Sequence, residues 1–138
     1  MSAWLLDVNC LLACAWTNHA DHSAMLDWLM ELSDWATCPL TESGFVRISM
    51  TVAYQASFED ARKSLATLRA LPGHRFVTDD VDAASLPLLL SYKGTTDAHL
   101  VTLAKRHGMK LATMDTALLA ESWAAGVAEN PLLPPRKS

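Results

Sequence analysis

The sequence predicts an α/β fold of three layers, in which a parallel sheet of four or five strands lies between helices. Short apolar runs alternate with amphipathic segments along the chain, and this alternation is typical of parallel sheets that are covered on both faces. The 138 residues contain no internal repeat, linker or change of composition, and their length suits one substantial core. We therefore expect a single domain over residues 1–138.

The strands are predicted from short apolar runs. The first run ends at Asp7 and the fourth ends at Asp115, and a helical pattern follows each of these acids. The predicted strands are AWLLDV (3–8), WATCPL (35–40), PGHRFV (72–77), MKLATM (109–114) and a short fifth one, VAEN (127–130).

The helices are predicted from apolar residues three and four positions apart and from residues that favour helix ends. Ser57 suits the N-cap of a helix that ends near Leu71, and threonines are expected to cap the helix that contains Asp97. The acidic stretch TDDVDAASLPLLL (78–90) predicts a helix start that Pro87 limits or kinks. The other predicted helices are NCLLACAW (9–16), a segment within 18–35, one that begins at Thr41 and DTALLAESWAAG (115–126), before a proline-rich tail (131–138).

Composition favours a globular, cytoplasmic protein without a membrane partner. Hydrophobic residues make up 51% and charged residues 19% of the chain. The N-terminus lacks the basic region of a signal peptide, and no apolar run approaches the ~20 residues that span a bilayer. The three cysteines, Cys10, Cys14 and Cys38, have no zinc-binding spacing and are expected to be buried thiols.

The net charge of −4 argues against binding to nucleic acid through bulk positive charge. This total counts carboxylates that would be neutralised by a bound metal ion. If four acids share one metal site, the rest of the surface is balanced, so the net charge excludes little.

Four acids are expected at one edge of the sheet. Asp7 ends the first strand, Glu42 follows the second and Asp115 ends the fourth. Asp97 opens the helix that leads into the fourth strand, so its side chain reaches this edge only if the N-terminus of that helix lies there. Ligands of open α/β sheets bind beyond the carboxyl ends of the strands. The four carboxylates are therefore a candidate site.

Helix capping is the alternative role for each aspartate, because Asp accepts hydrogen bonds from the first turn of a helix. Capping accounts less well for Glu42, since Thr41 beside it is the better cap. Four unpaired anions at one edge would repel each other by about 1–4 kcal/mol per close pair, which favours a bound cation. Carboxylate ligands indicate Mg²⁺ or Mn²⁺, and such ions can activate water and clamp a phosphodiester.

The segments that carry these acids resemble the motifs of PIN-domain ribonucleases, especially the VapC toxins of toxin–antitoxin pairs. The resemblance implies a PIN-like α/β/α sandwich and an Mg²⁺- or Mn²⁺-dependent endoribonuclease, with Asp7, Glu42, Asp97 and Asp115 as the catalytic, metal-binding acids. It also implies an RNA substrate, a cognate antitoxin and a homodimer. The matching segments are LLDVN (5–9), TESGFVRI (41–48), TTDAHLVTLA (95–104) and KLATMD (110–115).

Three further residues match supporting positions of the family. Asn9 could bind Asp7 or a metal-bound water, or simply start a helix. Thr113 could orient Asp115, or fill a strand as β-branched residues do. Arg47 could pair with an acid or contact a phosphate. His19 and His22 lack a third metal ligand nearby, so a solvated loop is their expected setting.

Two other functions remain open from the sequence. A signalling receiver domain would need a phosphorylated aspartate, and Asp79 and Asp80 are paired acids, but they follow the third strand and no lysine ends a late strand. A non-catalytic binding module on the same fold would keep the acids for stability alone. The RNA target, the number of metal ions and the antitoxin cannot be read from the chain.

Overall fold

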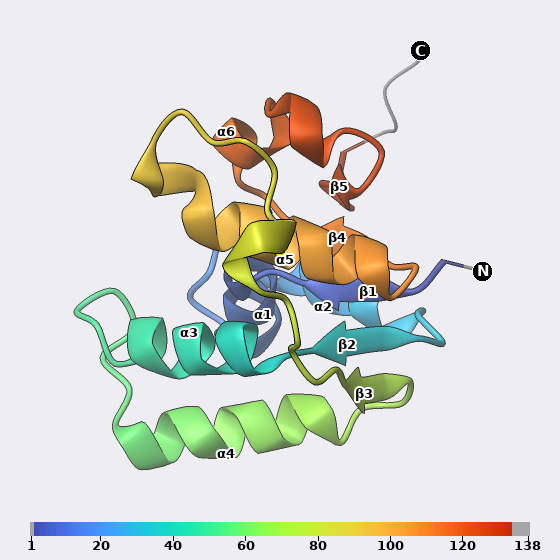
Figure 1. Cartoon of the computed structure of the whole chain (residues 1–138). Helices are drawn as coiled ribbons and strands as arrows, with labels where there is room; N and C mark the ends of the chain where they lie inside the picture. Colours follow the sequence, from blue (N-terminus) through green and yellow to red (C-terminus); the bar gives the residue numbers. More distant parts are fainter. Residues whose placement is uncertain (1, 134–138) are drawn as a thin grey trace.

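The computed structural model of the protein describes residues 2–133. The end of the predicted proline-rich tail, residues 134–138, lies outside this range. Five short parallel strands form one sheet in the order β3-β2-β1-β4-β5 (Figure 1). All five predicted strands are confirmed as β1 (Trp4–Leu6), β2 (Trp35–Thr37), β3 (His74–Phe76), β4 (Lys110–Ala112) and β5 (Ala128–Glu129).

Helices cover both faces of this sheet, which confirms the predicted three layers (Figure 1). Short 3-10 turns occur at Ala83–Ser85 (η1), Tyr92–Gly94 (η2) and Ser122–Ala124 (η3). The helices are α1 (Val8–Ala15), α2 (His22–Met30), α3 (Pro39–Ser49), α4 (Phe58–Arg69), α5 (Thr95–Arg106) and α6 (Thr116–Leu119).

Strand alternation divides the apolar interior into two cores. Leu6 of β1 packs with residues of α1, α2, α3 and α4 on one face of the sheet. Leu5, its neighbour, packs with residues of α5 and α6 on the other. Both side chains are completely buried, because successive residues of a strand point to opposite faces. The three cysteines are buried and free, as expected. Within the described residues, no helix is long and apolar enough to cross a membrane.

Three helix predictions need correction. The stretch 78–90 forms only the turn η1, because Asp79 and Asp82 accept hydrogen bonds from backbone groups two and three residues later and so stabilise turns instead of a helix. The helix predicted over 115–126 ends after one turn, at Leu119. Gly94, and not a threonine, occupies the cap position of α5.

The start of α3 also differs from the prediction. The helix begins at Pro39 instead of Thr41, since Pro is well suited to the first helical position. The Thr41 hydroxyl instead accepts a hydrogen bond from the N–H of Cys38, at 3.0 Å.

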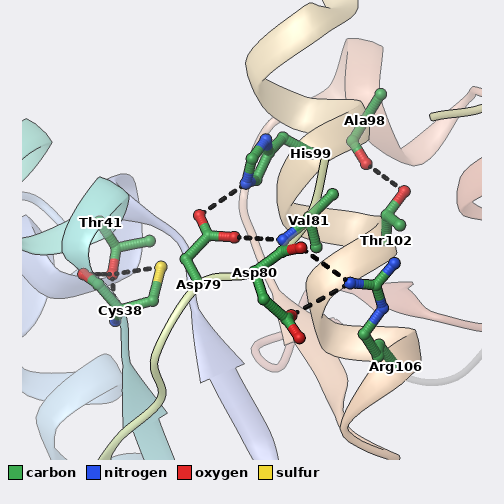
Figure 2. A network of polar contacts seen from close by, with 9 residues as sticks. All are labelled: Cys38, Thr41, Asp79, Asp80, Val81, Ala98, His99, Thr102 and Arg106. Carbon is green, nitrogen blue, oxygen red and sulfur yellow. Dashed lines mark hydrogen bonds and ion pairs between the residues drawn. The ribbon is translucent and has the colours of Figure 1, made fainter. Parts of the chain in front are cut away.

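The long segment between β3 and α5 is held against α5 by polar contacts (Figure 2). Asp79 Oδ2 lies 2.6 Å from His99 Nε2, and Asp79 Oδ1 accepts a hydrogen bond from the N–H of Val81. Asp80 pairs with Arg106 at 3.0 Å. Both carboxylates therefore anchor the segment that leads to α5.

Candidate metal site at the carboxyl edge

Thr113 joins the acids of β1 and β4. The two strands are parallel neighbours, with Leu6 opposite Ala112, so the residues that follow them lie side by side. The Thr113 hydroxyl donates to Asp7 Oδ2 at 2.7 Å and accepts from Asn9 Nδ2 at 3.3 Å. It also accepts from the N–H of Asp115 at 3.1 Å. One hydroxyl thus connects three of the residues that the sequence singles out.

Asp7 is both a helix cap and a member of this cluster. Its Oδ1 accepts from the N–H of Val8 at 2.8 Å, at the start of α1, and its side chain is only 7% exposed. Burial raises the pKa of Asp7; the hydrogen bonds from Thr113 and Val8 oppose this increase, and the nearby Asp115 adds to it. Burial of a carboxylate disfavours its charge, and a bound cation would offset that cost.

Asp97 lies in the first turn of α5, half-buried beside the same cluster. Its pKa is raised to about 6, first by burial and then by the charges of Asp7 and Asp115. The N-terminus of α5 therefore lies near this edge of the sheet, which is the condition that the sequence left open for Asp97. Three aspartates from distant parts of the sequence act on one another electrostatically.

Asp115 caps α6 and still has a free oxygen. Its Oδ1 accepts hydrogen bonds from the N–H groups of Ala117 and Leu118, at 3.0 and 3.2 Å. Its Oδ2 makes no hydrogen bond within residues 2–133, and neither does the side chain of Asp97. Capping and site membership are therefore compatible for Asp115, as they are for Asp7.

Glu42 lies in a different group of polar side chains. Its Oε2 accepts from the Thr37 hydroxyl at 2.5 Å, and its Oε1 pairs with Arg69 at 3.1 Å. Thr37 Oγ1 also lies 2.8 Å from His74 Nε2. The pKa of His74 is lowered by burial and by Arg69, while Glu42 opposes this decrease. No contact among the described residues joins Glu42 to the three aspartates.

The partners of Glu42 were not predicted from the sequence. Arg69 comes 27 residues later, at the end of α4, and no local pattern links the two. Only the packing of α3 against α4 brings them together.

The other predicted positions have mixed outcomes. Asn9 Oδ1 accepts from the N–H of Met114 at 3.2 Å, so Asn9 fixes the strand end that leads to Asp115. Arg47 is exposed on α3 and, within residues 2–133, has no ion-pair partner. Of its two proposed roles, only the phosphate contact remains a prediction. His19 and His22 are half-buried instead of fully solvated; they contact the backbone of Asp21 and Ala13.

The donor set suits a hard divalent cation, although the side chains are not gathered around one. Across residues 2–133, no group of three His, Cys, Asp or Glu side chains is arranged to hold a metal ion. Within residues 2–133, the oxygens of Asp97 and Asp115 Oδ2 make no hydrogen bond, and the pKa of Asp97 is raised first by burial and then by the charges of Asp7 and Asp115. Carboxylate oxygens of this kind are the usual protein ligands of Mg²⁺ and Mn²⁺. The residues therefore fit such an ion chemically.

Comparison with known proteins identifies the family. The model of the PIN domain matches residues 4–121, which include all four predicted acids. The chain belongs to the PIN-domain family. Its relatives include ribonuclease VapC38 of Mycobacterium tuberculosis, which is 46% identical over 121 residues, or 83% of this chain and 86% of the relative.

Two solved structures share the PIN fold at low sequence identity. VapC20 of M. tuberculosis, described as a sarcin-ricin loop cleaving toxin, has a TM-score of 0.64 and 12% identity, and covers 86% of this chain and 94% of its own. VapBC2 from Rickettsia felis, bound to a DNA fragment from its promoter, has a TM-score of 0.61 and 12% identity. The match covers 93% of this chain and 98% of the chain from Rickettsia felis. At this identity they support the fold alone. Membership of the PIN family removes the receiver-domain alternative, and both oxygens of Asp79 are already engaged.

Proposed function

We propose that this PIN-domain protein is a divalent-metal-dependent endoribonuclease and the toxin of a toxin–antitoxin pair. The observation that carries the proposal is the convergence of Asp7, Asp97 and Asp115 at the carboxyl edge, with the pKa of Asp97 raised to about 6 by burial and by the other two. VapC38, which is 46% identical to this chain, is named a ribonuclease, and this supports RNA as the substrate.

The three aspartates would hold Mg²⁺ or Mn²⁺. When bound, the ion would lower the pKa of a water and stabilise the charge that develops on the RNA phosphate. Thr113 keeps Asp7 Oδ2 oriented through the 2.7 Å hydrogen bond, and Asn9 in turn holds Thr113. Such partners behind a metal ligand fix its position.

Glu42 remains the predicted fourth metal-binding acid. Its oxygens already accept from Thr37 and Arg69, so an ion would compete with Arg69 for Glu42 Oε1. Arg47 is exposed on the same helix, α3, where it could contact an RNA phosphate.

The antitoxin partner is inferred from the family and from an apolar groove between α3 and α4. Met50 and Phe58, which are about half exposed, lie in this groove. Its full lining is Glu42, Ser43, Val46, Arg47, Met50, Phe58, Arg62 and Leu65. Exposed apolar grooves are typical binding sites for amphipathic helices. A cytoplasmic location and a homodimer are part of the same proposal, and sedimentation of the purified chain tests the homodimer.

RNA cleavage tests the proposal. The wild type should cleave single-stranded RNA only with Mg²⁺ or Mn²⁺, whereas Asp7→Asn and Asp97→Asn should lose nearly all activity while their circular dichroism spectra are unchanged. Asp27→Asn, an exposed acid on α2, is the matched control and should remain active. Equal activity of all four proteins would contradict the role of these aspartates, and no cleavage by the wild type would favour a non-catalytic binding module.

A further inference from the structure

The segment from Leu86 to Gly94 exposes apolar side chains next to the metal-site helix. Leu88 is 89% exposed, Leu90 100% and Tyr92 83%. Figure 1 shows this yellow segment beyond the carboxyl ends of the strands, beside the N-terminal end of α5. Three large, almost fully exposed apolar side chains within five residues are unusual for a surface without a partner.

The chain is anchored on both sides of this segment. Upstream, Asp79 and Asp80 contact α5 (Figure 2), and Arg106 Nη2 donates to Ser85 Oγ at 3.1 Å, next to Leu86. Downstream, the Thr95 hydroxyl donates to the carbonyl of Tyr92 at 2.6 Å. The exposed residues therefore do not belong to a loose loop end.

Packing in the middle of the segment also fixes its orientation. A Cβ atom added at Gly94 would lie 3.8 Å from Leu89 Cδ2 and 3.7 Å from Trp123 Cζ2. Leu89 thus packs inward beside Gly94, while its two neighbours, Leu88 and Leu90, are exposed. The alternation fixes which side chains face solvent.

Tyr92 lies close to the metal-site acids along the chain. The turn η2 runs directly into α5, and Asp97 is the third residue of that helix. With rises of about 2.0 Å per residue in a 3-10 turn and 1.5 Å in an α-helix, the backbone of Tyr92 lies about 8–9 Å from that of Asp97 along the helix axis. A single RNA strand bound at Asp97 spans such a distance within a few nucleotides.

From this placement we propose that Tyr92 stacks on an RNA base next to the cleaved phosphodiester, and that Lys93 contacts the adjoining phosphate. The inference rests on the proposed ribonuclease function. Exposed aromatic rings stack on unpaired bases of any sequence, and neighbouring cations neutralise phosphates. Without metal the acidic edge repels RNA, and a cation just outside it would favour binding of the strand. The tyrosine–lysine pair favours RNA over a second protein as the occupant of this segment.

The test measures RNA affinity without cleavage. A short, fluorescein-labelled single-stranded RNA of mixed sequence is titrated in EDTA, and binding is followed by fluorescence anisotropy. Tyr92→Ala should weaken binding about 5- to 100-fold, and Tyr92→Phe, which keeps the ring, should stay within about twofold of the wild type. Lys93→Gln should also weaken binding, and its difference in affinity from the wild type should become smaller as the salt concentration increases. Val52→Ala, equally exposed at 85% but after α3, is the control and should bind as the wild type does.

Several results would overturn the inference. These are unchanged RNA affinity in Tyr92→Ala, an equal loss in Tyr92→Phe, or a changed sedimentation mass in Tyr92→Ala with unchanged RNA affinity, which would assign the segment to a second copy of the chain. Cleavage assays separate the two proposals. If the wild type cleaves RNA and Tyr92→Ala shows the same KM, only the inference fails. If the wild type binds RNA through Tyr92 but never cleaves it, only the ribonuclease proposal fails.

Discussion

Replacing Asp97 with Asn should stabilise the protein in the absence of metal, and only at neutral pH. The pKa of Asp97 is about 6, against 3.8 for an ordinary aspartate, because burial and the charges of Asp7 and Asp115 disfavour its ionised form. Between pH 4 and 6 the folded protein therefore holds a proton that the unfolded chain has lost. Stability falls as pH rises through this window, and the full cost is present above pH 6.

The size of the effect follows from the same pKa. Each pKa unit corresponds to 1.36 kcal/mol, so a fully shielded site would lose about 3 kcal/mol. Asp97 is partly exposed, and solvent screening reduces this figure to about 1 kcal/mol. Asp97→Asn also removes a negative charge that is favourable in the first turn of α5, which offsets roughly 0.5 kcal/mol of this gain. The net gain of about 0.5 kcal/mol corresponds to a rise in Tm of roughly 1–3 °C for a chain of this length.

Thermal unfolding in EDTA, followed by circular dichroism at pH 7.5 and pH 4, measures this difference. Asp97→Asn should melt above the wild type at pH 7.5 and close to it at pH 4, while the control Asp27→Asn should follow the wild type at both. The electrostatic reasoning would be refuted if Asp97→Asn melts below the wild type at pH 7.5. It would also be refuted if the difference in Tm between the two proteins is the same at both pH values.

Two further predictions concern the frame of the site. Thr113→Val removes the hydroxyl that donates to Asp7 and should cost about 1–3 kcal/mol in urea unfolding and reduce RNA cleavage about 10- to 100-fold. Thr113→Ser keeps the hydroxyl and should be near normal; equal rates in the two variants would contradict the role. Gly44→Ala places a Cβ atom 2.7 Å from Val8 Cγ2 and should destabilise the fold by about 1–3 kcal/mol. Adding Val8→Ala should relieve the clash, so strictly additive losses in a double-mutant cycle would argue against it.

Much of this architecture is predictable from the sequence because the strands lie in local apolar runs, two of which stop at acids. Asp7 and Asp115 could be placed at one edge, since parallel strands bring their carboxyl ends together. The stretch 78–90 could not be predicted in the same way, because its acids stabilise turns through short-range hydrogen bonds that compete with a helix.

The finer contacts of the site depend on packing between distant segments. The Thr113 hydroxyl serves Asp7, Asn9 and Asp115 at once only because β1 and β4 pair in one particular register. The pairing of Glu42 with Arg69 depends on how α4 lies against α3. Neither arrangement can be predicted from the local sequence pattern.

Metal binding is the most direct test of the central claim that the aspartates at this edge share a divalent cation. A titration with Mn²⁺, followed by the loss of the free-ion electron paramagnetic resonance signal, needs neither an RNA target nor an antitoxin. The wild type and Asp27→Asn should bind Mn²⁺ alike, and Asp7→Asn and Asp97→Asn should bind it at least about tenfold more weakly. Equal binding by all four proteins, or no binding by the wild type, would contradict the account.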